Sequence, residues 1–159
     1  MVTIRHADGG EAAEACLELA RPMQAFNDDG LETMAEELPT LETVVAFEGE
    51  TLVGFASVTD HGPKVCELRW MAVRETHRNQ GVGTRLLDRV CERMVADGGR
   101  LLTVKTLADT VSFEPYVRTR AFYENRGFLH VETVDPYPDW GPGNPCAIYV
   151  KPLSSGASE

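Results

Sequence analysis

The sequence lacks the features that would place it in a membrane or outside the cell. None of its 159 residues belong to an apolar run approaching the ~18–20 residues that a membrane-spanning helix needs. Residues 1–6 do not resemble the apolar region of a signal peptide. There is no Cys-x-x-Cys pair, and the four cysteines are widely spaced among apolar neighbours. We therefore expect reduced thiols, a cytoplasmic location and no membrane partner.

Metal ligands and basic residues are also sparse. The four histidines are dispersed along the chain, so the sequence predicts no metal site. Only 15 Lys and Arg stand against 25 Asp and Glu, which gives a net charge of −10. A chain this acidic repels phosphate backbones, so we expect no nucleic-acid partner.

The charge is unevenly distributed along the chain. The first 60 residues hold 13 acidic and two basic side chains, whereas residues 61–100 hold eight basic and five acidic ones. This basic segment suggests an anion-binding site beside a surface that attracts cations. A second interpretation stays open, in which the acidic helices serve only to keep the protein soluble.

Hydrophobic periodicity and turn residues predict an α/β protein (an α+β mixed sheet) with the order β-α-α-β-β-β-α-β-α-β-β. The strand–helix–strand segment over residues 65–107 predicts a parallel crossover, whereas the hairpin before it is antiparallel. Residues 1–153 are expected to form one domain and residues 154–159 a disordered tail. The predicted strands cover 2–7, 44–47, 52–58, 65–73, 101–107, 128–134 and 146–150, and the predicted helices 11–20, 31–38, 82–96 and 119–126.

The sharpest motif is the segment RNQGVGT at residues 78–84, between a predicted strand and a predicted helix. Two glycines separated by one residue allow a ligand close to the backbone, and the free N–H groups of a helix N-terminus attract pyrophosphate. The segment has neither the lysine of a nucleotide-binding P-loop nor the spacing of a dinucleotide fold. Arg78 supplies charge, and Arg74 and Arg85 are further candidates.

Arg-x-x-Gly-x-Gly after the strand ELRWMAV resembles the acyl-CoA-binding motif of the GNAT N-acetyltransferase superfamily. The later segment TRAFYENRGF, residues 119–128, resembles the tyrosine-bearing helix of that superfamily. The resemblance covers about residues 2–151 and implies the GNAT-like fold. It also implies acetyl-CoA as co-substrate, held by Met71, Ala72, Val73, Arg78, Asn79, Gln80, Gly81, Val82, Gly83, Thr84, Phe122 and Tyr123.

The same resemblance implies the catalytic groups. Glu67 is the candidate base that removes a proton from the attacking amine, directly or through water. Tyr123 is the candidate acid for the departing thiolate, because a phenol is protonated at neutral pH. The backbone N–H of Met71 is the candidate oxyanion donor, in a strand expected to splay from the strand over residues 101–107. Glu67 as a solvated carboxylate paired with Arg69 is the structural alternative, and Trp70 faces either the core or the acceptor pocket.

The predicted activity is therefore transfer of an acetyl group from acetyl-CoA to a primary amine of a small molecule or peptide, by direct attack in a ternary complex. The acidic first third of the chain suggests that the acceptor is a cationic amine. A proline-rich aromatic loop over residues 135–145 is either a wall of the acceptor pocket or a rigid connection between strands. Two alternatives remain: a non-catalytic acyl-CoA-binding regulatory module, and an acyltransferase for a longer acyl chain or a hydroxyl acceptor. A homodimer is also left open.

Overall fold

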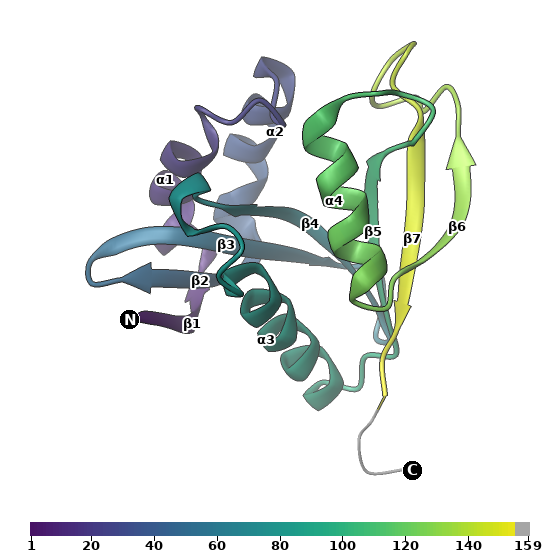
Figure 1. Cartoon of the computed structure of the whole chain (residues 1–159). Helices are drawn as coiled ribbons and strands as arrows, with labels where there is room; N and C mark the ends of the chain where they lie inside the picture. Colours follow the sequence, from purple (N-terminus) through teal and green to yellow (C-terminus); the bar gives the residue numbers. More distant parts are fainter. Residues whose placement is uncertain (155–159) are drawn as a thin grey trace.

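The computed structural model describes residues 1–154, so the predicted tail, apart from Ser154, lies outside the described residues. Seven strands form one sheet in the order β1-β2-β3-β4-β5-β7-β6. Figure 1 shows the sheet with its four helices. The strands are β1 (Val2–Asp8), β2 (Glu42–Glu48), β3 (Thr51–Asp60), β4 (Val65–Val73), β5 (Leu101–Leu107), β6 (Leu129–Val134) and β7 (Cys146–Pro152). The helices are α1 (Gly9–Ala20), α2 (Asp28–Glu37), α3 (Val82–Ala96) and α4 (Glu114–Asn125), with 3-10 turns at Leu38–Thr40 and Glu75–His77.

The sheet is mixed, as the sequence predicts. β4 pairs with β5 in parallel, and the other neighbouring pairs are antiparallel. The connection between β4 and β5 runs through α3, because parallel neighbours need a crossover. Two apolar clusters cover the two faces: one combines residues of α3 and α4 with the sheet, and the other combines residues of α1 and α2 with it.

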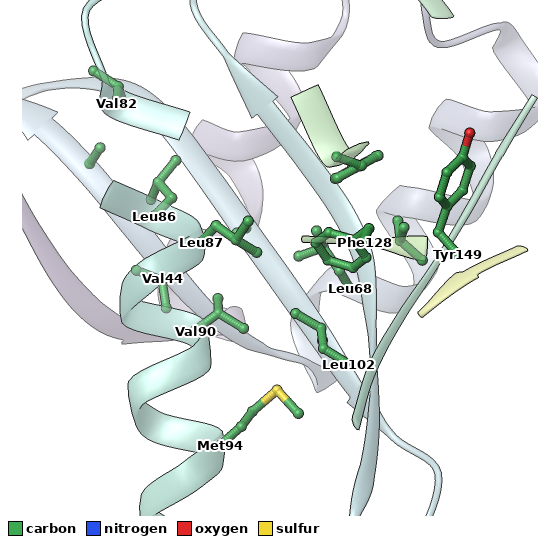
Figure 2. Packing of buried hydrophobic residues seen from close by; sticks show 14 of the residues in the cluster. Val44, Leu68, Val82, Leu86, Leu87, Val90, Met94, Leu102, Phe128 and Tyr149 are labelled. Atoms are coloured by element: carbon green, nitrogen blue, oxygen red, sulfur yellow. The ribbon is translucent and has the colours of Figure 1, made fainter. Parts of the chain in front are cut away.

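Helix α3 anchors the first of these clusters. Its apolar stripe is fully buried against the sheet, and each such side chain contributes about 1.5–3 kcal/mol relative to an exposed one. Figure 2 shows these side chains facing Leu68 of β4 and Leu102 of β5. The position of the α3 N-terminus is therefore fixed by packing along the whole helix. The stripe consists of Val82, Leu86, Leu87, Val90 and Met94.

Three helices begin earlier than the sequence pattern predicts, the first being α1, at Gly9 rather than at residue 11. α2 starts at Asp28 rather than at residue 31, because the Asn27 side chain caps it by accepting a hydrogen bond from the Gly30 N–H at 2.7 Å. α4 starts at Glu114 rather than at residue 119, with a proline in its first turn. The sequence of this first turn shows only a weak apolar pattern. The turn is held instead by a tertiary contact, in which the Tyr116 hydroxyl donates to the Ala25 carbonyl at 2.8 Å.

Candidate active site

The central feature of the site is the separation of β4 from β5. Their ladder ends at the pair Leu68 and Val104, although β4 continues to Val73 and β5 to Leu107. Just beyond this last pair, the register between β3 and β4 shifts, so that Arg69 is the extra residue of a β-bulge. In Figure 1 the two strands run apart beyond this point. The splay predicted between them is therefore present.

The backbone of β4 faces this opening at alternate residues. The Arg74 N–H donates to the Val53 carbonyl at 2.7 Å, so Arg74 directs its backbone groups toward β3. Because strand residues alternate, the backbone groups of Met71 and Val73 point away from β3, toward the unpaired side. Ala72, between them, points its backbone toward β3. The Met71 N–H thus points into the opening between β4 and β5.

The RNQGVGT segment forms the start of α3. Gly81 has a left-handed backbone with φ of 83°, and no side chain caps the helix that begins at Val82. The first N–H groups of α3, those of Val82, Gly83 and Thr84, therefore have neither an intrahelical acceptor nor a side-chain cap. Together with the helix dipole they provide a positive site for an anion. Asn79, with φ of 63°, belongs to the same turn.

Close packing leaves little room for a side chain at Gly83. A Cβ built at this residue would lie 3.1 Å from Cε1 of Phe122 and 3.5 Å from Cε of Met71. Predicted cofactor-binding residues from β4, α3 and α4 therefore meet at this point. A side chain at residue 83 would force the Phe122 ring to shift by a few tenths of an ångström.

The arginines near the loop have different partners. Arg74 donates to the Leu52 carbonyl at 2.9 and 3.3 Å, and Arg85 donates to the Val2 carbonyl at 3.0 Å. Both of these candidates from the sequence are thus held by backbone. Arg78 donates to the Val73 carbonyl at 3.3 Å and lies near Met23 of the α1–α2 loop.

A cation that sequence reasoning did not single out, Arg126, lies at the end of α4. Its Nε donates to the Thr84 hydroxyl at 2.7 Å, and its guanidinium lies 4.0 Å from the centre of the Phe122 ring. It thus contacts the first turn of α3. Its place directly before Gly127, in the segment that resembles the family's tyrosine helix, is the signal that could have found it.

Glu67 lies buried on the other face of β4, with 3% of its surface exposed. His61 Nε2 lies 2.7 Å and Lys105 Nζ 3.4 Å from its Oε1. Burial by itself would lower the pKa of Lys105, but the neighbouring Glu67 and Tyr137 raise it above its usual value. The carboxylate is therefore held between a half-exposed imidazole and an ammonium.

The alternative pairing of Glu67 with Arg69 is wrong. Arg69 instead forms a two-pronged ion pair with Glu37 of α2, at 2.7 and 3.0 Å, and the Trp70 indole donates to the same carboxylate at 2.9 Å. Trp70 also packs edge-on to Phe26, with ring centres 6.3 Å apart. This cluster ties α2 to the bulged part of β4.

Tyr123 lies inside the cluster below α4. Its ring packs against Phe122 and Phe128, with centres 5.6 and 5.1 Å away, and 7% of the residue is exposed. Burial raises the pKa of its phenol well above the usual value, so the hydroxyl stays protonated at neutral pH. Within residues 1–154 no hydrogen bond to this hydroxyl is formed, which leaves it available to a ligand atom.

Over residues 1–154, no group of three or more His, Cys, Asp or Glu is placed to hold a metal ion. Within the same range, no helix is both long and apolar enough to cross a membrane.

The acetyltransferase (GNAT) family model matches residues 11–128 of the sequence. A search of curated proteins found no match. Among solved structures, a protein described as a GNAT-family acetyltransferase from Desulfovibrio desulfuricans is similar, with a TM-score of 0.82 and 23% identity. The similarity covers 97% of this chain and 100% of that one.

Two other solved structures share the fold. The ribosomal-protein-S18-alanine N-acetyltransferase from Escherichia coli has a TM-score of 0.75 and 19% identity, over 97% of this chain and 95% of that one. A GNAT family acetyltransferase from Elizabethkingia anophelis, with acetyl-CoA bound, has a TM-score of 0.73 and 18% identity, over 96% and 98% of the two chains.

Proposed function

Because the chain belongs to the acetyltransferase (GNAT) family, we propose that it transfers the acetyl group of acetyl-CoA to a primary amine. The observation that carries the proposal is the opening between β4 and β5. There the backbone of Met71 and Val73, which β5 leaves unpaired, lies beside the uncapped N-terminus of α3, and Arg78 donates to the Val73 carbonyl. An extended pantetheine arm can pair with that backbone as an added strand would, while its pyrophosphate meets the helix.

The cofactor is expected to bind along three elements. The pyrophosphate contacts the N–H groups from Gly81 to Thr84, with Arg78 and Arg126 supplying charge. The pantetheine arm follows β4 and passes over the packed contact between Gly83 and Phe122. Acetyl-CoA in the Elizabethkingia structure supports this choice of co-substrate.

In the proposed reaction, the amine nitrogen attacks the thioester carbonyl carbon. The Met71 N–H donates to the oxygen as negative charge develops there. The amine proton passes to Glu67, directly or through a water molecule, and the C–S bond breaks. The Tyr123 hydroxyl donates its proton to the departing sulfur, and its raised pKa keeps that proton in place until the thiolate forms.

The acceptor is proposed to reach the thioester from the α1–α2 side, where Glu67 lies. The Escherichia coli relative is named for acetylating an alanine of a ribosomal protein, so both peptide and small-molecule amines belong in the search. A ternary complex is favoured over a covalent acyl-enzyme, because the residues gathered here supply a base and an acid and no activated nucleophile. Burial raises the pKa of Cys66 to about 12, which makes that thiol a poor nucleophile.

The test is CoA release from acetyl-CoA across a panel of primary amines, with Glu67→Gln and Tyr123→Phe beside the wild type. We expect each variant to lower kcat by about 10²-fold or more, with the dissociation constant of CoA little changed. Tyr116→Phe is the comparison for the tyrosine, because it removes a hydroxyl of the same helix whose hydrogen bond, to the Ala25 carbonyl, is structural. Tight CoA binding without turnover of any amine would favour a binding module instead. Full activity of Tyr123→Phe would remove the assignment of the acid.

A further inference from the structure

Arg120 of α4 is a buried cation with few partners. It is 8% exposed, and its one hydrogen bond runs from Nη1 to the Leu107 carbonyl at 2.6 Å. Among residues 1–154 no carboxylate lies within 4.0 Å of its guanidinium. A guanidinium has five N–H donors, so most of its capacity is unused.

Burying such a charge without a counter-ion is costly, and the chain does not lack carboxylates to pair with it. Neighbouring basic groups illustrate the contrast. Arg69 on β4 binds both oxygens of Glu37, and Lys105 on β5 contacts Glu67. Arg120 is the one arginine of residues 1–154 that is buried, and it has no carboxylate partner, which indicates that its anion comes from outside the chain.

The guanidinium lies at the opening between β4 and β5. The Ala108 N–H donates to the Pro145 carbonyl at 3.0 Å, so Ala108 directs its backbone toward the end of β7. Strand alternation therefore turns the Leu107 carbonyl, which Arg120 binds, toward β4. Counted from the last ladder pair, Leu68 and Val104, this carbonyl is about level with Met71 across the opening.

A second unpartnered group lies at the same end of β5. Thr106 is 2% exposed, and its Oγ1 is the one buried side-chain oxygen or nitrogen within residues 1–154 that has no hydrogen-bond partner. Its side chain shares the strand face of Leu102 and Val104, which belong to the cluster beneath α3 and α4. A hydroxyl buried without a partner costs about 1–3 kcal/mol, so it too points to an absent ligand atom.

We propose that Arg120 and Thr106 form a carboxylate-binding subsite at the β4–β5 opening. This inference rests on the proposed acyl transfer. A guanidinium can bind both oxygens of a carboxylate, and a threonine hydroxyl can donate to one of them. The carboxylate is carried either by the acyl group of the donor thioester or by the acceptor amine, since both must meet in this opening.

One arm of the test varies the acyl donor. Succinyl-CoA and butyryl-CoA have acyl chains of four carbons and differ in a terminal carboxylate. If the donor carries the carboxylate, the wild type prefers succinyl-CoA, by kcat/KM and by dissociation constant. The second arm keeps acetyl-CoA and compares β-alanine with β-alaninamide as acceptors. A preference in this arm alone assigns the carboxylate to the acceptor.

The variants are Arg120→Met, Arg120→Lys and Thr106→Val. Arg120→Met should lower the ratio of charged to uncharged substrate by about 30-fold or more in the arm that shows the preference. Arg120→Lys should restore part of that ratio, and Thr106→Val should lower it less. Arg118→Met is the matched control, because Arg118 is an exposed arginine of the same helix that pairs with Glu114.

The proposal is overturned if the wild type shows no carboxylate preference in either arm, or if Arg120→Met leaves the ratio unchanged. If no amine is turned over, the proposed transfer fails by itself. The dissociation constants of succinyl-CoA against butyryl-CoA, and of β-alanine against β-alaninamide in the presence of CoA, still decide whether the subsite exists. The wild-type comparison needs no variant, so a failure of Arg120→Met to fold does not prevent that decision.

Discussion

Replacing Glu37 by glutamine should destabilise the protein by removing the charge that joins α2 to β4. The carboxylate accepts two hydrogen bonds from Arg69 and one from Trp70. Hydrogen bonds to a charged group contribute about 1.5–3 kcal/mol when buried, whereas fully exposed ion pairs contribute about 0.2–1 kcal/mol. The side chains of Arg69 and Glu37 are 26% and 33% exposed, between these limits. A glutamine oxygen can still accept one hydrogen bond, so we expect a loss of about 1–2 kcal/mol.

Acid should remove the same stabilisation. Burial by itself would raise the pKa of Glu37, but the hydrogen bonds from Arg69 and Trp70 outweigh it and hold the pKa below its usual value of 4.5. A carboxyl whose pKa is lowered by folding stabilises the protein above the unfolded-state pKa and loses this contribution as the pH falls through the folded-state value. The stability difference between wild type and Glu37→Gln should therefore be constant near neutral pH and shrink below about pH 4.5.

Thermal and urea unfolding of both proteins between pH 7 and pH 3.5 measure this difference, and about 1–2 kcal/mol corresponds to a melting temperature lower by about 2–8 °C at pH 7. Glu36→Gln is the matched control, because it makes the same chemical change at the exposed neighbouring residue of α2. Equal losses in Glu36→Gln and Glu37→Gln would refute the reasoning. So would a difference that stays constant down to the pH at which the wild type itself unfolds.

Two other variants test the loop and the thiols. Gly83→Ala should not give the gain of about 1 kcal/mol that alanine ordinarily brings to a helix, because its Cβ would lie 3.1 Å from the Phe122 ring and force that ring to shift; chemical denaturation without cofactor measures it, and a gain of that size would contradict the packing argument. Burial and the hydrogen bond to Asp60, 3.1 Å from Sγ, raise the pKa of Cys66 to about 12. Asp60→Asn should therefore increase the rate at which iodoacetamide alkylates Cys66 at pH 8, read by peptide mass spectrometry against Cys91 in the same molecule; an unchanged rate would mean that access, not ionisation, limits the reaction.

The middle of the fold could be predicted to the residue. The bounds of β4, α3 and β5 agree with those expected from periodicity, because each element is a strong apolar pattern with a turn signal at one of its ends. These signals are Gly62-Pro63 before β4, Gly81 before α3 and Gly98-Gly99 between α3 and β5. The earlier start of α2 was also encoded locally, by Asn27 as a cap with Asp28 and Asp29 in the first turn. The first turn of α4 was not encoded locally in the same way, because it depends on a contact between Tyr116 and the distant loop at Ala25.

The candidate site divides in the same way. Glu67, Tyr123 and the RNQGVGT loop could be selected from motifs, since a resemblance fixes which residues to examine. The partners of Glu67 could not be selected, because His61 and Lys105 reach it through the β3–β4 turn and the neighbouring strand. Arg120 was also invisible in the sequence. An arginine on a helix is ordinarily exposed, and only the structure reveals one that is buried without a counter-ion.

The acidity of the first third of the chain has local causes that compete with attraction of a cationic substrate. Asp8 caps α1, and Asp28 and Asp29 lie in the first turn of α2, where the helix dipole favours negative charge. Glu37 is occupied by Arg69. Near Glu67, the basic groups His61 and Lys105 offset the carboxylate. The negative net charge of the whole chain therefore does not make this site negative. A cationic acceptor would have to be recognised by the remaining exposed carboxylates of α2. Dissolved salt screens the electrostatic attraction of these exposed groups. Its KM should then rise with ionic strength, whereas an acceptor held by Arg120 through a buried carboxylate should depend on salt much less.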